Sequence, residues 1–588
     1  MTIKNNIIIR AYCFYVLVII IGLLIIAKIV IIQLNDTSRS SVQYIEIESI
    51  PGNLYSSDNK ILATTIASYD IRIDMNIGHI QNSDYNQIIE DVSTAIGSVI
   101  NNADKNALKN RLQEARKLRN RYFLIKSAIG LEELQGLKNF NVFQKSNNKT
   151  GLMVVKKFKR IYPFSSMALR TIGYSTNNNM VGIEGAYNSY LTSESVKVPI
   201  TRGLGGIVVP LDADYLGINK GSDITLTIDT KLQSILQEVL LNSLIANKAE
   251  SGTAILMEVK TGKIKAISNF LQNIDNTYSE KFNLAVGSSI EPGSTFKLAS
   301  IMAALEDKKF NINDSVNVEN GSTKFYNHIL RDVTKPQQEN ITIKEAFKYS
   351  SNVGIAKAIW NSYKNNPQQF INRLKQFHMA SKLDLDIKGE GMPAIKTPQD
   401  STWSKITLPW MSIGYEVLQT PLNILSLYNT VANNGTMVKP QFVEQIKNDD
   451  EIIQKFETII IENKICSKQT IKQAKILLEE AGKLYTEKLG KSLYYSVAGK
   501  TGTAQIAILN KGYKVQGERI KYRASFAGYF PADNPEYSMV IMINAPRQAY
   551  YGAQVAFPIF QEIVNKIYMI NTKDFKDIKH LTLNETYM

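Results

Sequence analysis

A serine and a lysine three residues apart, Ser294 and Lys297, could together perform nucleophilic chemistry. They follow Pro292 and Gly293 and lead into residues 298–305, whose apolar positions repeat at helical spacing. On a buried helix the two side chains share a face, and the hydroxyl lies near the N-terminus, where free backbone N–H groups favour developing negative charge. Burial also lowers the pKa of a lysine. The pair therefore predicts a nucleophile and its base.

A second polar motif, Ser350-Ser351-Asn352, follows a predicted helix over residues 343–349. Such support is needed, because a Ser-Xaa-Xaa-Lys spacing alone arises by chance in most long chains. A serine hydroxyl can relay a proton, and an amide can hold a peptide backbone. Ser350 and Asn352 are therefore further candidate site residues.

A third motif, Lys500-Thr501-Gly502-Thr503, lies in residues 499–506, which could begin a strand. On a strand edge, a lysine and threonines can bind a carboxylate, and a glycine lets a substrate approach the backbone. Each motif alone also fits an ordinary turn. In the order Ser-Xaa-Xaa-Lys, Ser-Xaa-Asn, Lys-Thr-Gly, they form the signature set of penicillin-binding enzymes and serine β-lactamases.

A second Lys-Thr-Gly, residues 260–262, precedes Ser294 and so has the wrong order. It lies at the tip of a predicted hairpin formed by residues 252–259 and 264–268, where a structural turn explains it. Lys500 is therefore the predicted substrate-binding lysine.

The elements that must position these motifs alternate between strands and helices. Strands are predicted at both ends of the region and helices between them, which indicates an α+β domain whose sheet joins distant parts of the chain. Besides the hairpin, the predicted strands are residues 223–229, 524–529 and 537–544, and the predicted helices are residues 231–246, 420–434 and one from just after Pro558 to about Tyr568.

The preceding region, residues 35–220, contains no catalytic constellation. Residues 68–75 alternate as a strand does, and residues 93–137 predict charged helices. These helices are most simply solvated, and a docking surface is the alternative. A Gly-rich patch at residues 203–206 lacks the strand-to-helix context of a phosphate loop and is interpreted as a turn.

An apolar segment, residues 11–34, is long enough for a membrane helix in which Lys28 snorkels. No small-Xaa-small cleavage site follows its apolar core, so an uncleaved anchor is favoured over a removed signal peptide. The positive-inside count is close to a tie, because Lys4 and Arg10 precede the span while Lys28 and Arg39 end or follow it. The C-terminal part is placed outside the cytoplasm because its chemistry requires this.

The composition excludes several other classes. The two cysteines, Cys13 and Cys466, form neither a disulfide framework nor a metal-type cluster. A net charge of +15 is spread along the chain without a nucleic-acid signature, which favours an anionic membrane face or wall polymer over nucleic acid. Four histidines lack ligand spacing, so neither a metal nor a cofactor is expected: His79, His328, His378 and His580.

The chain resembles the class B penicillin-binding proteins, single-pass membrane D,D-transpeptidases of bacterial peptidoglycan synthesis. The resemblance covers nearly the whole chain, and residues 183–185 and 388–391 look most like the cell-division branch of Gram-negative bacteria. One departure is Pro51-Gly52, where the family usually has an Arg-Gly pair, so the inter-domain or partner contacts made there stay open. The strings that carry the resemblance are Tyr162-Pro163 and residues 182–187, 291–297, 350–354, 414–416, 499–505 and 528–532.

The resemblance implies an α+β fold in which a single transmembrane helix and an elongated non-catalytic pedestal of the dimerisation type precede the catalytic domain. That domain is expected to be penicillin-binding/β-lactamase-like, with an antiparallel sheet flanked by helices. The implied segments are a cytoplasmic tail (1–10), the anchor (11–34), the pedestal (35–220), the transpeptidase domain (221–570) and a C-terminal tail (571–588).

The resemblance also implies catalytic roles. Ser294 attacks the penultimate D-alanyl carbonyl of a stem pentapeptide, and neutral Lys297 takes its proton. Ser350 relays a proton to the departing D-alanine, and Asn352 holds the substrate amide. An amine of a neighbouring stem peptide then takes the acyl group, with carboxypeptidase activity as a side reaction.

Substrate binding is assigned in the same way. Lys500, with Thr501, Gly502 and Thr503, receives the terminal carboxylate, and the backbone N–H groups of Ser294 and Thr503 form the oxyanion hole. The implied partners are peptidoglycan stem peptides, β-lactam antibiotics, the inner membrane, a membrane glycosyltransferase and other divisome proteins. The catalytic domain is expected in the periplasm, working on the septal wall.

Four alternatives stay open. An elongation-type transpeptidase shares the same motifs. A serine β-lactamase needs an activating glutamate after its second motif, whereas Glu238 of Glu-Val-Leu-Leu-Asn precedes Ser294 and lies in a predicted helix, which indicates coincidence. A β-lactam sensor usually has several membrane spans, but a wall-synthesis scaffold with a vestigial serine would need only one.

Overall fold

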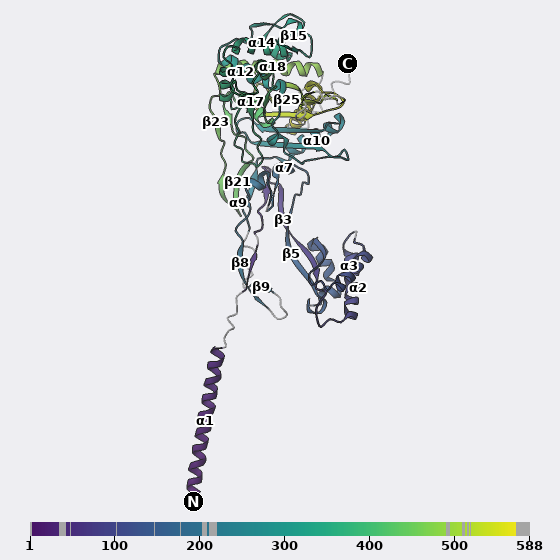
Figure 1. Cartoon of the computed structure of the whole chain (residues 1–588), viewed down its shortest axis with the longest axis vertical. Helices are drawn as coiled ribbons and strands as arrows, with labels where there is room; N and C mark the ends of the chain where they lie inside the picture. Colours follow the sequence, from purple (N-terminus) through teal and green to yellow (C-terminus); the bar gives the residue numbers. More distant parts are fainter. Residues whose placement is uncertain are drawn as a thin grey trace. The chain divides into compact units, whose positions relative to one another are not determined.

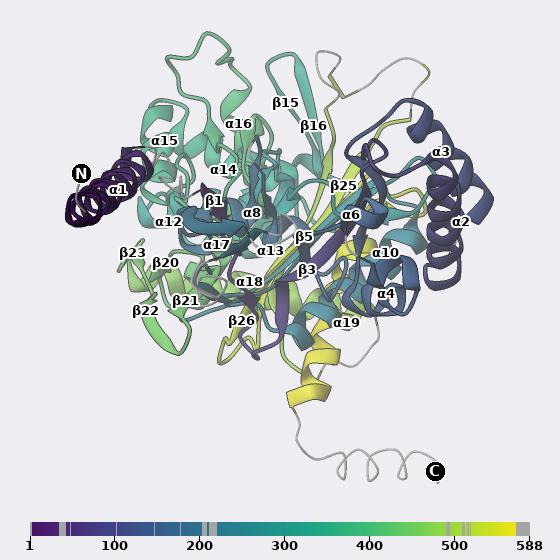
Figure 2. The same cartoon turned by 90° about the horizontal axis from the view of Figure 1, so that it is seen from below.

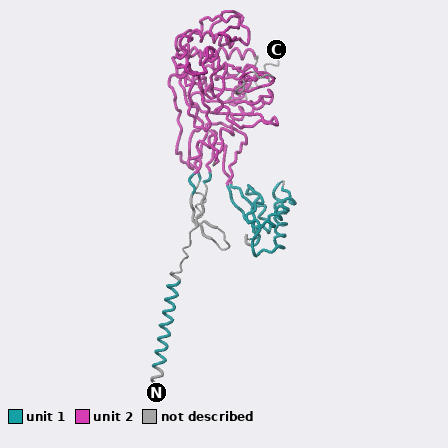
Figure 3. Tube along the Cα trace, viewed as in Figure 1, with its two compact units in different colours: residues 1–50, 67–157, 193–220 teal, residues 51–66, 158–192, 221–588 magenta. Residues whose placement is uncertain are grey.

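The computed structural model describes residues 3–571 except 35–42, 48, 102, 146, 177, 203–207, 211–219, 490–493, 508–511, 514–516 and 518 (Figure 1). The predicted turn at residues 203–206 and nearly all of the predicted C-terminal tail lie outside the described residues. The backbone forms two compact units (Figure 3). Unit 1 contains Met1–Ile50, Ala67–Lys157 and Ser193–Lys220, and unit 2 contains Pro51–Ile66, Phe158–Thr192 and Gly221–Met588.

The N-terminal apolar segment is a helix, α1 (Ile3–Leu34), as predicted. Within it, Ile8–Ile31 is 24 residues long with a mean hydropathy of 3.0. At a rise of about 1.5 Å per residue, this length exceeds the ~30 Å hydrocarbon core of a bilayer. Its apolar side chains are exposed along the whole span. A helix that is apolar all round fits a membrane anchor.

The core of unit 1 is formed by four helices, α2 to α5, packed on paired strands. α2 buries a stripe that includes Tyr85 and Ile96, and Asp104 caps α3, its carboxylate accepting the first backbone N–H groups. Within the predicted helical stretch 93–137, a strand, β4, pairs antiparallel with β3, so that stretch is only partly helical. The elements are β3 (Ile61–Ile73), α2 (Asn82–Val99), α3 (Lys105–Lys117), β4 (Phe123–Ile129), α4 (Leu131–Lys138), α5 (Asn141–Gln144), α6 (Asn147–Thr150) and β5 (Leu152–Ile161).

Unit 2 is organised around an antiparallel six-stranded sheet with the order β13-β12-β11-β26-β25-β24. Its strands come from two distant stretches of the chain, as predicted, and the predicted hairpin is β11 with β12. The second Lys-Thr-Gly, residues 260–262, lies in the turn of this hairpin. The strands are β11 (Ser251–Glu258), β12 (Ile264–Gln272), β13 (Tyr278–Ser279), β24 (Ala498–Gln505), β25 (Tyr522–Phe530) and β26 (Tyr537–Asn544).

Helices cover both faces of this sheet (Figure 2). On one face α19 packs Phe560 edge-on against Phe526 of β25, with ring centroids 4.6 Å apart. On the other face α17 holds β26 through Asn429, which accepts a hydrogen bond from Ser538 at 2.7 Å. Phe526 of β25 is paired with Ile541 of β26, so their side chains lie on the same face. Side chains alternate between the two faces along a strand, and Ser538 lies an odd number of residues from Ile541, so Ser538 points to the opposite face. These helices are α10 (Thr230–Asn247), α17 (Pro421–Ala432) and α19 (Gly552–Asn571).

The last helix differs from its prediction. α19 begins at Gly552, and Pro558 lies inside it instead of preceding it. A proline cannot donate its backbone hydrogen bond and normally ends a helix. Here the packing of Phe557 and Phe560 on the sheet outweighs that local preference.

The remaining elements of unit 2 surround this sheet. The helical group contains η2 (Gly293–Phe296), α12 (Lys297–Glu306), α13 (Ile343–Lys348), α14 (Asn352–Tyr363), α15 (Pro367–Gln376), α16 (Thr407–Met411) and α18 (Lys468–Leu489). A hairpin of β15 (Ser322–Phe325) and β16 (His328–Arg331) precedes α13, and β14 (Ser315–Asn317) pairs with β17 (Asn340–Thr342). Outside this group lie β2 (Leu54–Tyr55), α8 (Gly182–Ala186), β10 (Asp223–Leu226), β21 (Val443–Asn448) and β22 (Glu451–Lys455).

Arg160 contacts the segment in which Pro51 replaces the usual arginine. Its Nη1 donates to the carbonyl oxygen of Gly52 at 2.7 Å and to Thr65 Oγ1 at 3.1 Å, and its Nε pairs with Glu184 at 2.8 Å. Burial raises the pKa of Glu184, and the charge of Arg160 opposes that rise. An arginine from elsewhere in the sequence thus anchors the Pro51-Gly52 segment within unit 2.

Candidate active site

Ser294 lies in a tight turn instead of the first turn of an α-helix. The turn, η2, is a 3₁₀ helix, and α12 begins at Lys297. Gly293 has φ +60°, and a Cβ on it would lie 2.8 Å from the Cβ of Ala504. A Cβ on Gly502 would lie 2.3 Å from Ser525 Oγ on β25 and 3.1 Å from Thr295 Cγ2. The close packing of η2 on β24 therefore requires glycine at position 293, and β25 and η2 together leave no room for a side chain at position 502.

Hydrogen bonds from three directions hold this turn. Gly293 donates its backbone N–H to the carbonyl of Gly414 at 3.1 Å. The hydroxyl of Tyr428, on α17, donates to the carbonyl of Thr295 at 2.9 Å, and Arg523, on β25, donates to the carbonyl of Glu291 at 3.0 Å. The backbone on both sides of Ser294 is therefore fixed before a substrate arrives, and the residue as a whole is 8% exposed.

Lys297 is fully buried and faces the second motif. Its Nζ donates to the carbonyl and hydroxyl oxygens of Ser350 at 2.8 and 3.3 Å and to Asn352 Oδ1 at 2.8 Å. Burial, and then the charge of Lys500, lower the pKa of Lys297 well below its ordinary value, while Asp332 opposes the shift. An amine that loses its proton this easily can act as a general base.

The second motif forms a short turn between α13 and α14. Ser350 adopts φ +60°, a left-handed conformation that is uncommon for serine. Ser351 caps α14 by accepting the backbone N–H of Gly354 at 2.9 Å, and it donates to Asp332 at 2.7 Å. Asp332 also accepts the N–H of Val353 at 2.9 Å. The carboxylate therefore locks the turn that carries Ser350.

Lys500 lies on β24, the edge strand of the sheet, and is fully buried. Its Nζ donates to the hydroxyl of Tyr485 and to the carbonyl of Thr501, each at 3.0 Å, and to Thr501 Oγ1 at 3.3 Å. Burial lowers the pKa of Lys500 to about 7. No ion pair joins Lys500 to a carboxylate among the described residues.

The other residues of the third motif also have defined partners. Thr501 Oγ1 donates to the Tyr485 hydroxyl at 2.8 Å, and Thr503 Oγ1 accepts the backbone N–H of Gly552 at 3.0 Å. Because η2 packs on β24, Ser294 and Thr503 belong to adjoining segments. An edge strand leaves alternate backbone N–H groups unpaired, as an oxyanion hole requires.

All three motifs thus contribute to one group of side chains in unit 2. Sequence reasoning missed two members, Tyr485 and Asp332, because nothing in their local sequence marks them. Glu238, the glutamate considered for a β-lactamase, does not belong to this group: it is on α10 and pairs with Lys566 at 3.1 Å. No group of side chains with metal-binding geometry occurs among the described residues.

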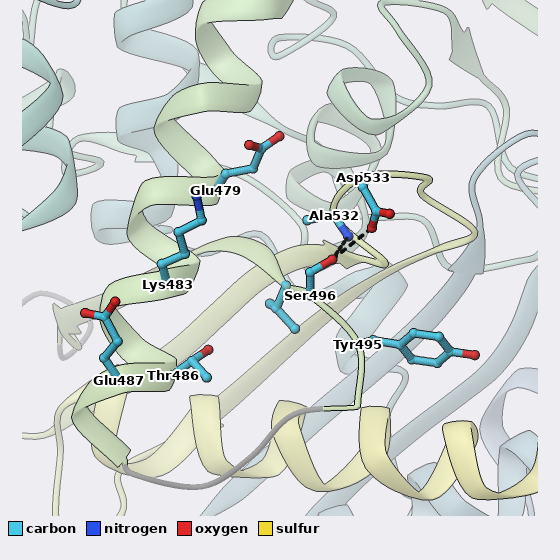
Figure 4. A pocket seen from close by; sticks show the side chains of 9 residues that line it. Glu479, Lys483, Thr486, Glu487, Tyr495, Ser496, Ala532 and Asp533 are labelled. Atoms are coloured by element: carbon cyan, nitrogen blue, oxygen red, sulfur yellow. Dashed lines mark hydrogen bonds between the residues drawn. The ribbon is translucent and has the colours of Figure 1, made fainter.

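A cavity of about 560 Å³ lies beside α18 and the segment that leads into β24 (Figure 4). Ser496, Asp533 and Lys483 are among its lining residues, and Ser496 donates to Asp533 at 2.9 Å. None of the predicted site residues lines it. It is therefore separate from the group around Ser294.

Comparison with known proteins gives two matches along the chain. Residues 252–565 match the family described as "Penicillin binding protein transpeptidase domain", and residues 46–199 match "Penicillin-binding Protein dimerisation domain". Peptidoglycan D,D-transpeptidase FtsI of Buchnera aphidicola subsp. Baizongia pistaciae is 30% identical over 433 residues, 71% of each chain. Stage V sporulation protein D of Bacillus subtilis is 27% identical over 429 residues, 70% of this chain and 64% of that protein.

A solved structure shows the same fold. Penicillin Binding Protein 2X from Streptococcus thermophilus aligns with a TM-score of 0.70 and 19% identity, over 90% of this chain and 80% of that one. This confirms the predicted α+β architecture, in which an apolar helix and a dimerisation-type region precede an antiparallel sheet flanked by helices.

Proposed function

The chain belongs to the class B penicillin-binding proteins, which are serine peptidoglycan D,D-transpeptidases, and we propose that it crosslinks stem peptides in the septal wall during cell division. The observation that carries the catalytic assignment is the position of Lys297. This buried amine follows the turn that contains Ser294, its pKa is lowered, and its Nζ contacts the hydroxyl of Ser350. The septal role is supported by residues 183–185 and 388–391, whose sequences look most like those of the division branch.

In the proposed acylation, Ser294 Oγ forms a bond to the penultimate D-alanyl carbonyl carbon while Lys297 Nζ takes the hydroxyl proton. The backbone N–H groups of Ser294 and Thr503 stabilise the resulting oxyanion, at a few kcal/mol per donor. Collapse breaks the peptide bond, and the departing D-alanine amine receives a proton through Ser350. Asn352 holds the substrate amide during these steps.

Deacylation completes the reaction. The amine of a neighbouring stem peptide attacks the ester carbonyl and gives a proton to Lys297 Nζ, the new amide forms as the bond from the carbonyl carbon to Ser294 Oγ breaks, and Lys297 returns the proton to the Ser294 oxygen. Water in place of the amine gives the carboxypeptidase side reaction. Lys500, Thr501, Gly502 and Thr503 bind the terminal carboxylate of the donor peptide, and a β-lactam acylates Ser294 because it mimics D-alanyl-D-alanine.

A labelled penicillin tests the nucleophile. We expect stable covalent labelling of the wild-type chain and none of Ser294→Ala. Ser300→Ala is the matched control, since Ser300 is also buried, on α12, and its hydroxyl donates to the carbonyl of Phe296. Covalent labelling that survives in Ser294→Ala would contradict the assignment, and rapid multiple-turnover hydrolysis would favour a β-lactamase.

We further propose that α1 anchors the chain in the inner membrane, with residues 1–10 in the cytoplasm and the catalytic domain in the periplasm. The substrate, peptidoglycan, lies on the outer side of the inner membrane, and a transpeptidase must reach it, which supports this orientation. A protease added outside spheroplasts should digest the catalytic domain and spare an epitope placed before residue 8. The opposite protection pattern would reverse the orientation.

Cellular position separates the division role from its alternatives. A fluorescent fusion should form mid-cell rings and co-purify with a membrane glycosyltransferase and other divisome proteins, whereas sidewall patches would indicate an elongation enzyme. Rescue of a transpeptidase-depleted strain by Ser294→Ala would favour a sensor or scaffold. The proposed boundaries of the pedestal (35–220) and transpeptidase domain (221–570) can be tested by limited proteolysis.

A further inference from the structure

Two residues of the carboxylate-binding motif meet at one tyrosine oxygen. Tyr485 lies on α18 and is 5% exposed. Its hydroxyl oxygen accepts hydrogen bonds from Lys500 Nζ at 3.0 Å and from Thr501 Oγ1 at 2.8 Å. No other side chain among the described residues bonds to both.

The tyrosine supplies polar support without a charge. Lys500 is buried, and the rings of Phe347 and Tyr485 lie 5.7 Å from its Nζ. A carboxylate in this place would neutralise the ammonium and compete with an incoming carboxylate. A neutral hydroxyl satisfies one donor of the lysine and leaves its charge available to the ligand.

Packing fixes the position of the hydroxyl independently of its hydrogen bonds. The ring of Tyr485 lies 6.1 Å from Phe526 on β25 and 5.7 Å from Phe557 on α19. Phenylalanine at this position would keep these contacts and lose only the oxygen. The hydroxyl can therefore be tested separately from the ring.

We propose that Tyr485 is a positioning residue that holds Lys500 and Thr501 in the arrangement that receives the terminal carboxylate of the donor peptide. The proposal rests on the proposed function of the third motif. Tyr485 itself need not touch the substrate. It joins α18 to the edge strand β24 at the point where the carboxylate binds.

The substitution Tyr485→Phe tests this with two thioester substrates that differ only at their terminus. For an acyl-D-alanyl thioester ending in a carboxylate, we expect kcat/KM for acylation to fall about tenfold, the effect of losing a hydrogen bond to a charged group. For the same thioester ending in a carboxamide, we expect a change of less than about twofold, because it does not use the charge of Lys500. Tyr363→Phe is the control, since Tyr363 is equally buried and its hydroxyl donates to Asp307 at 2.8 Å.

The pH profile provides a second readout. The titratable groups closest to Lys500 are Tyr485 on α18 and Lys297 on α12. The charge of Asp332 acts on Lys297. Lys348 of α13 and Glu480 of α18 form an ion pair with each other. Removing an oxygen that accepts from the ammonium favours neutral Lys500. The alkaline limb for the carboxylate substrate should therefore move to lower pH in Tyr485→Phe and stay in place in Tyr363→Phe.

The outcomes separate the possibilities. Equal losses for both substrates, with an unmoved pH profile, would show a purely structural role and overturn the proposal, as would wild-type kinetics for Tyr485→Phe. Unfolding midpoints identify any general loss of stability. If the wild-type chain itself is not acylated, the proposed function fails instead.

Discussion

The burial of Lys500, the proposed carboxylate-binding lysine, carries a cost in stability. A lysine whose pKa falls on folding releases its proton when the chain folds, so below its unfolded pKa it opposes folding, and the penalty grows as the pH falls toward the folded pKa. Burial lowers the pKa of Lys500 to about 7. We expect Lys500→Met to raise the free energy of unfolding at pH 7 by roughly 2–4 kcal/mol, at about 1.4 kcal/mol per pKa unit, while abolishing penicillin acylation.

Urea unfolding at pH 7 and pH 10 measures this effect. The gain in the free energy of unfolding should nearly vanish at pH 10. That pH is close to the pKa of lysine in the unfolded chain, so little free energy is then needed to remove its proton on folding. Lys263→Met is the control, since Lys263 is partly exposed and pairs with Glu444 at 2.8 Å. A Lys500→Met chain that is less stable at pH 7 would contradict the prediction.

At the residue scale, the sequence predicted candidate site residues that the fold brings into one group, but not the side chains that contact them. Ser294, Lys297 and Lys500 stand in short motifs whose residue types and order are informative. Tyr485 reaches β24 only because α18 packs on that strand, and Asp332 reaches Ser351 only after the chain folds back. Such contacts between separate elements leave no local pattern.

At the scale of elements, the close approach of η2 to β24 should control reactivity. Gly293→Ala would place a Cβ in contact with Ala504 and impose alanine on a left-handed backbone, so the two segments must separate. Because Ser294 lies on η2 and the proposed carboxylate-binding residues lie on β24, we expect the rate of penicillin acylation to fall at least tenfold.

Stopped-flow acylation with a fluorescent penicillin measures the loss. Gly389→Ala is the matched control, because Gly389 has φ +98° but nothing lies within 4 Å of the Cβ position. It should lose stability of about 1 kcal/mol with little change in acylation rate. Equal rates for the two variants would show that backbone strain, and not the approach to β24, is responsible.

Elements with strong periodicity were predicted well, and those decided by packing were not. The predicted helix 231–246 is α10, and the predicted strand 537–544 is β26. The first turn around Ser294 is 3₁₀ because Gly293 must fit against β24, and β4 is a strand because β3 is its partner. Residue patterns cannot show such partners.

At the scale of the whole molecule, the Arg160–Glu184 pair joins distant parts of the sequence within unit 2. Arg160→Met leaves the Glu184 carboxylate buried without its counter-ion, and we expect a loss of about 3 kcal/mol in the free energy of unfolding at pH 7. Because burial raises the pKa of Glu184, acid protonates the carboxylate and removes the unpaired charge. The loss should therefore shrink at pH 5.

Denaturant unfolding of the double variant Arg160→Met/Glu184→Gln provides the control. It should be more stable than Arg160→Met alone, since no charge is then buried. A double variant less stable than the single one would contradict this explanation. The pair also shows why Pro51 could not be interpreted from sequence: the arginine that contacts its segment lies over a hundred residues away.

The anchor should be separable from the chemistry. A chain beginning at residue 43 lacks α1, so we expect it to leave the membrane fraction and still acylate penicillin at close to the wild-type rate. Fractionation and labelling of the same sample measure both properties. Loss of labelling in a chain that remains folded would show that α1 also supports the catalytic unit.

The low pKa of Lys500 links ligand binding to proton exchange. An anionic ligand that contacts Lys500 raises its pKa, so at neutral pH each binding event takes up a fraction of a proton from the buffer. Calorimetry of a non-covalent carboxylate ligand should give heats that vary with the ionisation enthalpy of the buffer. The affinity should rise as the pH falls toward the pKa of Lys500 and then level off, so occupancy of the proposed carboxylate site would depend on the acidity around it.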